Sequence, residues 1–377
     1  MKSPMNRRRF AGIASGAVLA ASATLRTSFT AGAQSATAEA TAVAGSISLD
    51  PSSPEALGIP PVPEAAVSTA DNAVSYATAT APYANFGTDA APGEFPREVR
   101  HAFGTTRIEK QPERVVVLDS GELDAAIFLG IIPVGAAEYL ASGLPRYVAD
   151  RVEGITLVGT TAEPDLEGIL ALQPDLILSS KLRHDEEMYD RLSHIAPTVF
   201  AERPGVTFKQ NFKLYAQALG REIEGAALVR TYEDGCRAAN AQLPLPRPTT
   251  SIVQVRPDSV RFYQRANFLG VVLTDLGFPR NDGENVDDFG VDGSLEELGL
   301  YADGEFLLLA VQSEQAADMA GTVTSSDVWK TLPAVQNDNV LEVPSDTFIG
   351  GIGYGAAIDV VNTLCGYFGI DPVIELS

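Results

Sequence analysis

The sequence predicts an α/β fold made of two related lobes that are joined by a long helix. Short apolar strands alternate with helical segments, which is typical of lobes built on a largely parallel sheet. Two stretches, 165–178 and 294–309, place a polar N-cap and a Leu-Glu pair before a buried strand in the same order. Between them, residues 206–243 carry apolar side chains at helical spacing and contain no proline.

The N-terminus predicts export. Asn6-Arg-Arg-Arg-Phe10 precedes an apolar stretch from Ala11 to Leu25 and the sequence Ala31-Gly-Ala33. This order is typical of a twin-arginine signal peptide over 1–33 with cleavage after Ala33. A retained anchor is disfavoured because the apolar stretch is shorter than the roughly 18 residues of a spanning helix. No cysteine follows this stretch, so we expect no lipoprotein anchor.

Composition separates a linker from the folded part. Residues 34–95 are rich in Ala, Thr, Ser and Pro and have few large aliphatic residues, so we expect a disordered linker there. The formal net charge of −22 disfavours nucleic acid and anionic membranes as partners. Cys236 and Cys365 are the only cysteines, and the sequence leaves open whether they form a disulfide.

The N-terminal lobe, over 96–205, is expected to contain five strands and a helix that Ser120 caps. The expected strands are 115–119, 133–136, 156–159, 176–180 and 198–201. As one helix, residues 206–243 would span about 50 Å, and the glycines within it weaken this prediction without forcing a break.

The C-terminal lobe, over 244–377, is expected to open with a hairpin of strands 251–256 and 260–263. The elements expected after it are helices 267–276, 294–300 and 356–368 and strands 306–311 and 340–343. The glycine-rich run 350–355 is not a phosphate loop, because no Gly-Lys-Ser/Thr follows it. We expect it to be a flexible approach to the last helix.

The two repeated stretches also predict which side chains face inward. Helical spacing gives one inward face in each stretch, and its members are Leu166, Ile169 and Leu170 in the first stretch and Leu295 and Leu298 in the second. Glu167 and Glu296 then point outward at matching positions.

Several motifs follow one another in a specific order between about residues 98 and 370. They are Pro112 to Leu118, Leu123 to Gly135, Gln173 to Leu178, Ser180 to Val199, Ala218 to Arg221, Val255 to Asp258, Val272 to Pro279 and Trp329 to Val335. Together they resemble the substrate-binding proteins of iron-siderophore ABC importers. The resemblance implies two Rossmann-like lobes joined by a single long α-helix, with a ligand cleft between the lobes.

The same resemblance implies the ligand and the partners. The expected ligand is a ferric siderophore, with carboxylate or mixed hydroxamate chelates favoured. The siderophore would hold the iron, so no cofactor and no direct metal ligand are expected. The expected partners are the permease subunits of an ABC importer, and we expect a monomer located outside the cytoplasmic membrane.

The resemblance also implies a role for Glu167 and Glu296. In similar proteins the carboxylate after Leu in each of these helices docks into an arginine pocket of a membrane subunit, which here corresponds to Glu167 and Glu296. The helix dipole alone would also favour an acid in a first turn. Ser294 and Glu297 fit a capping box, which leaves Glu296 without a local role. We therefore expect Glu167 and Glu296 to contact the importer.

An anionic ferric chelate needs local positive charge in an acidic protein, and Arg suits chelate oxygens best. Lys181, Arg183 and His184 directly follow strand 176–180, which is the crevice position of open α/β sheets. Similar proteins use basic residues of this loop as ligand contacts. The alternative is a solvated loop that is paired with Asp185 and Glu186.

In the C-terminal lobe we expect ligand contacts from Arg256, Arg261 and Tyr263 on the hairpin. Alternation puts Arg261 and Tyr263 on one face of their strand, whereas Arg256 has the alternative of pairing with a nearby carboxylate. Tyr139 and Tyr354 are further candidates for the cleft lining.

Other functions fit the sequence less well. The three histidines lack paired metal-ligand spacing, and no serine lies in a nucleophile elbow. This disfavours an enzyme and a binder of bare metal ions. The acidic run from Asp119 to Asp124 is explained by a capped helix start rather than by a catalytic pair. A cobalamin or haem binder of the same fold, or a sensory or adhesive derivative without transport, remains the alternative.

Overall fold

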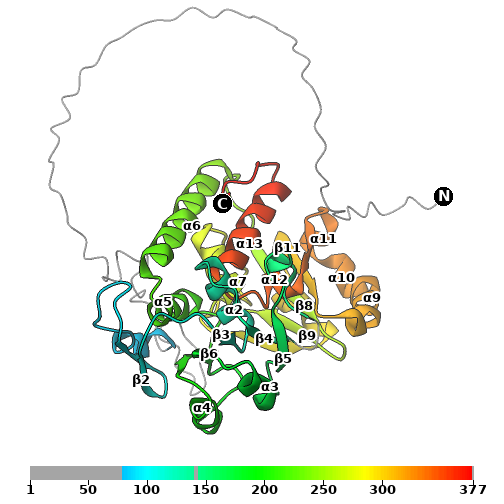
Figure 1. The fold of residues 1–377 in the computed structure, drawn as a ribbon. Helices are drawn as coiled ribbons and strands as arrows, with labels where there is room; N and C mark the ends of the chain where they lie inside the picture. Colours follow the sequence, from blue (N-terminus) through cyan, green and yellow to red (C-terminus); the bar gives the residue numbers. More distant parts are fainter. Residues whose placement is uncertain (1–78, 140–142, 376–377) are drawn as a thin grey trace, which may run out of the picture. The chain divides into compact units, whose positions relative to one another are not determined.

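The computed structural model describes residues 79–139 and 143–375 (Figure 1). The predicted signal peptide and the predicted linker up to residue 78 lie outside the described residues. Within the described part, no helix is long and apolar enough to cross a membrane.

Residues 79–95 are ordered, so the predicted linker is wrong for this segment. It contains the 3-10 helix η1 (Ala81–Ala84), and Gly87 forms an antiparallel bridge with Arg100. The Tyr83 hydroxyl accepts a hydrogen bond from the backbone N–H of Glu202 at 3.0 Å. One aromatic side chain thus anchors a segment whose average composition is that of a disordered chain.

The N-terminal lobe has a five-stranded sheet in the order β5-β4-β3-β6-β7 (Figure 1). The sheet is parallel, as predicted. Its strands are β3 (Val115–Val117), β4 (Gly135–Glu138), β5 (Thr156–Thr160), β6 (Leu176–Ser180) and β7 (Thr198–Ala201). Its helices are α2 (Ser120–Phe128), η3 (Arg146–Val148), α3 (Leu166–Ala171) and α4 (Glu186–Ser193). The hairpin of β1 (Arg97–His101) and β2 (Gly104–Ile108) was not predicted.

The cap of α2 differs from the prediction by one residue. Asp119 is the N-cap, and its carboxylate accepts the N–H of Ser120. The Ser120 hydroxyl instead donates to the backbone carbonyl of Gly350 in the other lobe. A carboxylate is as good an N-cap as a hydroxyl. Because Asp119 caps the helix, the Ser120 hydroxyl is available for a contact between the lobes.

The C-terminal lobe has a mixed sheet in the order β10-β9-β8-β11-β12. Its strands are β8 (Thr250–Val255), β9 (Val260–Tyr263), β10 (Gly290–Gly293), β11 (Phe306–Val311) and β12 (Val340–Pro344). Strands β8, β11 and β12 are parallel, and β9 and β10 are antiparallel to their neighbours, which confirms the predicted opening hairpin.

Short helices cover this second sheet and lead to the C-terminus. They are α7 (Phe268–Asp275), η4 (Leu295–Glu297), α8 (Leu298–Tyr301), η5 (Glu314–Ala316), α9 (Ala317–Ser325), α10 (Asp327–Thr331), α11 (Pro333–Gln336), α12 (Ser345–Phe348) and α13 (Tyr354–Tyr367). The helix predicted over 294–300 is therefore a 3-10 turn, η4, followed by one turn of α-helix.

The segment 206–243, predicted as one connecting helix, contains two helices, so the predicted bounds of the connector are wrong. The two helices are α5 (Phe208–Leu219) and α6 (Glu222–Gln242). Gly220 ends α5 with a left-handed backbone, φ 65°, which is the usual glycine C-cap. A side chain at Gly220 would overlap the ring of Phe95. Gly220 therefore does break the predicted helix. Its position requires a positive φ and leaves no room for a side chain next to Phe95.

The glycine-rich run before α13 is a packed contact between the lobes, so its predicted flexibility is wrong. The Asp124 carboxylate of α2 accepts the N–H groups of Gly355 and Ala356 at 3.1 and 3.0 Å. A β-carbon at Gly353 would overlap Asp124, and one at Gly355 would overlap Phe128. These glycines let the start of α13 approach α2 closely.

Cys236 in α6 and Cys365 in α13 are buried free thiols. Both belong to the main hydrophobic core. Burial raises the pKa of the Cys236 thiol to about 12, which keeps this thiol protonated and unreactive.

We predict that Asp124→Ala lowers the free energy of unfolding by about 1–3 kcal/mol, because two buried backbone N–H groups at the start of α13 lose their acceptor. Urea unfolding followed by circular dichroism measures the change. Asp318→Ala is the matched control, since Asp318 is an exposed acid in the first turn of α9. Equal stability of the two variants would contradict this role of Asp124.

Candidate ligand-binding site

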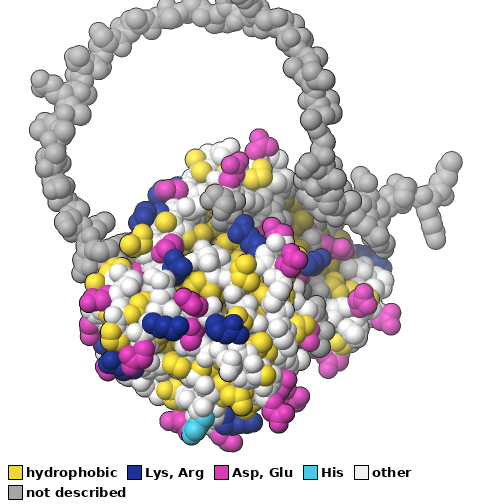
Figure 2. Space-filling model, viewed as in Figure 1, with side chains coloured by type: hydrophobic (Ala, Val, Ile, Leu, Met, Phe, Trp, Pro, Cys, Tyr) yellow, Lys and Arg dark blue, Asp and Glu magenta, His cyan; other side chains and the backbone are white. Residues whose placement is uncertain are grey.

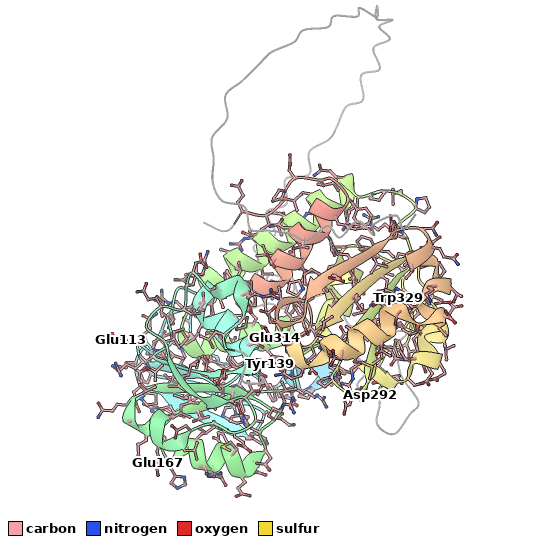
Figure 3. All side chains as sticks on the ribbon, turned by 90° about the vertical axis from the view of Figure 1, so that its right-hand side faces the viewer. Glu113, Tyr139, Glu167, Asp292, Glu314 and Trp329 are labelled. Atoms are coloured by element: carbon pink, nitrogen blue, oxygen red, sulfur yellow. The ribbon has the colours of Figure 1, made fainter. Side chains whose placement is uncertain are left out.

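Polar groups from both lobes converge around Tyr139, which follows β4. Figure 3 shows Tyr139 where the two lobes face each other. Burial raises the pKa of Tyr139 to about 12, with added contributions from Tyr263 and Asp119, while Arg183 and Arg256 oppose this rise. Charge interactions weaken with distance, and the Tyr139 ring lies against Gly350 of the C-terminal lobe, so groups of both lobes lie in one region. The sequence predicted four of these five residues.

The two hairpin arginines share one carboxylate. The Arg261 Nε donates to Asp292 Oδ1 at 2.7 Å, and the Arg256 Nη1 donates to the same oxygen at 3.1 Å. Asp292 on β10 lies directly opposite Arg261 on β9 in the strand register. Arg261 lowers the pKa of Asp292. Arg256 therefore has the carboxylate partner that the sequence left open, and the sequence did not identify Asp292.

Tyr263 and Arg261 both contact Phe289, as expected for residues on one face of β9. The rings of Tyr263 and Phe289 meet edge to face with centroids 5.5 Å apart. The guanidinium of Arg261 lies 5.9 Å from the Phe289 centroid, and that of Arg203 lies 5.4 Å from it. The Tyr263 hydroxyl donates to Gln254 at 3.1 Å. A half-buried phenyl ring thus links cations of the two lobes.

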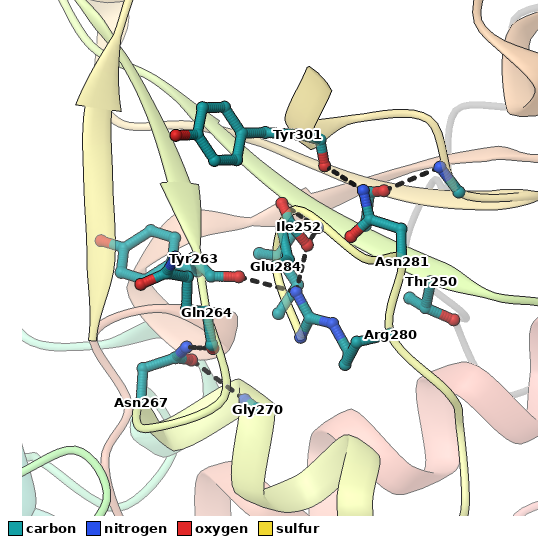
Figure 4. Close-up of polar contacts among 12 residues, drawn as sticks. Thr250, Ile252, Tyr263, Gln264, Asn267, Gly270, Arg280, Asn281, Glu284 and Tyr301 are labelled. Atoms are coloured by element: carbon teal, nitrogen blue, oxygen red, sulfur yellow. Dashed lines mark hydrogen bonds and ion pairs between the residues drawn. The ribbon is translucent and has the colours of Figure 1, made fainter. Parts of the chain in front are cut away.

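A buried ion pair is bonded to the backbone of this hairpin (Figure 4). Arg280 and Glu284 are 7% and 0% exposed and form an ion pair. The Glu284 carboxylate accepts the N–H of Ile252 on β8 at 2.9 Å, and Arg280 donates to the carbonyl of Tyr263 on β9 at 2.6 Å. The pair bonds to both strands that carry the candidate contacts, so it fixes their relative position.

The basic loop after β6 contributes one free cation rather than three. Lys181 pairs with Glu202 at 3.0 Å. Asp185, the partner expected in the solvated-loop alternative, caps α4 instead. Arg183 is exposed and lies near Asp119, and among the described residues it forms no ion pair. Arg203 follows the next strand, β7, and likewise has no ion-pair partner in the described part of the chain.

The sequence missed Arg203 as a candidate, although a signal was present. Arg203 follows β7 as Arg183 follows β6, and neighbouring parallel strands end at the same edge of their sheet. Together with Arg183 it provides guanidinium groups that are not paired with a carboxylate of any described residue. Such groups are suited to bind an anionic ligand.

His184 and Tyr354, two of the predicted ligand contacts, have buried side chains, as Tyr263 also has at 4% exposed. The His184 Nδ1 lies 2.9 Å from the Ser179 hydroxyl, and burial lowers its pKa, so this imidazole is a neutral core group. Tyr354 is 1% exposed and packs against Phe208, Phe212 and Tyr232. Loop and glycine-rich surroundings suggested exposure in both cases, whereas the fold turns both rings inward.

Two buried acids lie beneath the site. Asp119 and Glu122 are 4% and 1% exposed. Burial raises the pKa of Asp119 to about 6, against the hydrogen bonds of Ser120 and the charge of Arg183. Burial and the Asp119 charge raise the pKa of Glu122 to about 8, and the Tyr215 hydroxyl donates to Glu122 at 2.6 Å. The Asp119 carboxyl therefore gains or loses its proton near neutral pH, and it lies close to Arg183.

The two expected docking acids are exposed in first turns. Glu167 lies in α3, at the outer end of the N-terminal lobe in Figure 3, and Glu296 lies in η4. Glu297 accepts the N–H of Ser294 at 2.8 Å, which confirms the capping box. Hydrogen bonds from its own backbone and from Ser294 lower the pKa of Glu296, so its carboxylate stays ionised at the surface.

Acidic and basic side chains are interspersed over the face in Figure 2. With a net charge of −22 for the whole chain, the cluster of Arg183, Arg203, Arg256 and Arg261 is a local reversal of charge. Within the described residues, no group of three or more His, Cys, Asp or Glu is placed to hold a metal ion. The arrangement can bind an anion that brings its own metal.

Comparisons with known proteins agree with this geometry. The family model described as "Periplasmic binding protein" matches residues 115–347. The "Probable siderophore-binding lipoprotein YfiY" of Bacillus subtilis is 32% identical over 285 residues, which are 72% of this chain and 87% of that protein. The Fe(3+) dicitrate-binding periplasmic protein FecB of Escherichia coli is 28% identical over 272 residues, which are 70% of this chain and 87% of FecB.

Among solved structures, the chain is similar to Staphylococcus aureus SirA complexed with staphyloferrin B. The TM-score is 0.66 and the sequence identity is 32%, and the match covers 73% of this chain and 99% of SirA.

Proposed function

Because the chain belongs to the periplasmic binding protein family, we propose that it captures a ferric siderophore and delivers it to an ABC importer. The observation that carries the proposal is the convergence of Tyr139, Arg183, Arg256 and Tyr263 from the two lobes. Relatives that bind ferric dicitrate and a siderophore support the ligand class. The proposed role is binding rather than catalysis.

The charge of the site favours a chelate with carboxylate groups. A guanidinium presents parallel N–H donors that match a carboxylate in a bidentate way. Arg261 already binds Asp292 in this manner, while Arg183 and Arg203 carry no such partner among the described residues. We therefore assign the main contacts with the anionic chelate to these two arginines. The hairpin arginines of the C-terminal lobe would close the opposite side, whereas Tyr139 belongs to the same lobe as Arg183 and Arg203.

Delivery requires export and a partner in the membrane. We assign export to the twin-arginine signal over 1–33, and location to the outside of the cytoplasmic membrane. We assign docking on the permease subunits to Glu167 and Glu296, one in each lobe, because both are exposed acids in first turns. Opposite charges at such an interface fix the register and raise the encounter rate. The protein is expected to act as a monomer.

We predict that the mature protein binds a ferric siderophore with a Kd of about 1 μM or lower, and that Arg183→Glu weakens this binding at least about tenfold by repelling the anionic chelate. Quenching of tyrosine and tryptophan fluorescence across carboxylate, hydroxamate and catecholate chelates measures the affinity. Arg237→Glu is the control, since Arg237 is exposed on α6. No saturable response to any chelate would refute the proposed function.

We predict that binding tightens about three- to tenfold as the pH falls from about 7 to about 5. The pKa of Asp119 is raised to about 6, so its carboxyl is charged above this pH and neutral below it. Protonation removes a negative charge beside Arg183, which favours an anionic ligand. Because ligand protonation affects both proteins equally, the comparison with Asp119→Asn isolates this effect. An identical pH profile in the variant would exclude Asp119 as its source.

We predict that the double variant Glu167→Ala with Glu296→Ala abolishes iron uptake by cells and leaves the Kd for the chelate unchanged, because both carboxylates lie in surface turns. Uptake of radiolabelled iron and the fluorescence titration measure the two properties. The matched control is Glu187→Ala with Glu314→Ala, which removes first-turn acids from α4 and η5. A loss of chelate binding in the first variant would mean that these glutamates are structural.

A further inference from the structure

An exposed leucine accompanies each of the two docking acids. Leu170 follows Glu167 by three residues and is 59% exposed, and Leu300 follows Glu296 by four residues and is 58% exposed. The inward position that helical spacing predicted for Leu170 is therefore wrong. Residues three apart share a helical face, so Leu170 lies on the same face of α3 as Glu167. Leu300 lies in α8, about one turn after Glu296 in η4.

One buried residue orients both turns in the same way. Ile169 and Leu298 each follow the glutamate by two residues, and both are 0% exposed. Ile169 packs in the core of the N-terminal lobe, and Leu298 packs in that of the C-terminal lobe. These anchors hold the turns on their lobes, so Leu170 and Leu300 are not needed for that purpose. We call the segments 167–170 and 296–300 the docking turns.

Ile223 is another exposed aliphatic residue next to acids, but its neighbouring acids are paired with arginines. Ile223 is 70% exposed at the start of α6. Its neighbours Glu222 and Glu224 are already paired, with Arg97 and Arg221. Glu167 and Glu296 have no ion-pair partner in the described part of the chain. In each docking turn, by contrast, an exposed leucine adjoins an acid that forms no ion pair with any described residue.

We propose that Leu170 and Leu300 are interface residues that dock, beside Glu167 and Glu296, on the importer's membrane subunits. The proposal rests on the proposed function and adds the chemistry of the partner surface, which is an arginine pocket with an apolar rim. An exposed ion pair contributes little to binding, because water and salt screen it. A leucine that becomes buried next to the pair adds hydrophobic free energy and excludes water from it.

The test replaces both leucines in the full chain, Leu170→Ser with Leu300→Ser, and measures two properties. Uptake of radiolabelled iron by cells is measured with the chelate that binds tightest in the fluorescence titration, and the Kd for that chelate is measured in solution. We expect uptake to fall at least about tenfold and the Kd to change less than about twofold. Ile223→Ser is the matched control and should leave uptake unchanged.

A conservative variant separates docking from folding. Leu170→Met with Leu300→Met keeps the apolar surface and should retain uptake, and thermal unfolding should give the same Tm for all of these proteins, because the substituted side chains are exposed. A serine variant that takes up iron within about twofold of the unsubstituted protein would overturn the proposal. So would a methionine variant as defective as the serine variant.

The glutamate variants distinguish this proposal from the proposed function. If Glu167→Ala with Glu296→Ala abolishes uptake while the serine variant does not, the apolar contacts are wrong and the docking function stands. If neither pair of substitutions affects uptake while the chelate still binds, docking through these turns is wrong in both respects.

Discussion

The arrangement of the two lobes depends on one buried carboxylate, that of Asp124. It lies on α2 of the N-terminal lobe and accepts the first backbone N–H groups of α13 from the C-terminal lobe. Four N–H groups at a helix start lack partners within the helix, so a carboxylate from elsewhere can satisfy two of them at once. The glycines before α13 follow from this contact, since a side chain at Gly353 or Gly355 would overlap the N-terminal lobe. Separating the lobes here would leave these N–H groups without their acceptor, which opposes movement of one lobe away from the other.

The sequence predicted the parts of the fold that depend on local pattern. Strands β6, β7, β9 and β11 have the predicted bounds, because short apolar or alternating patterns between turn residues specify strands without reference to the rest of the chain. The errors concern positions whose structure depends on contacts with residues far away in the sequence. Gly220 breaks the connector because Phe95 packs against it, and Tyr354 is buried because α5 and α6 bring aromatic rings around it. His184 follows a strand as a ligand residue would, but its ring turns inward to Ser179.

The site was predictable to the extent that it follows strand ends. Arg183 and Tyr139 were proposed from strand ends and Arg256 and Arg261 from the hairpin, and Arg203 follows β7 in the way that Arg183 follows β6. Asp292 could not be predicted, because its relation to Arg261 depends on the pairing of β9 with β10, a strand without an apolar pattern. This carboxylate changes how the site works. It neutralises part of the hairpin charge, so the arginines of the N-terminal lobe carry the unbalanced charge that an anionic chelate meets first.

A fixed junction also bears on how a loaded protein meets its importer. Glu167 and Glu296 lie on turns that buried anchors attach to separate lobes. If the lobes moved freely, the two acids would reach two membrane subunits together only in a fraction of the conformations, and the affinity would fall by that fraction. The contact of Asp124 with α13 removes this cost, because it holds the lobes and therefore both docking turns in one arrangement. The same buried interaction thus serves both ligand capture, through the walls of the cleft, and delivery, through the spacing of the acids.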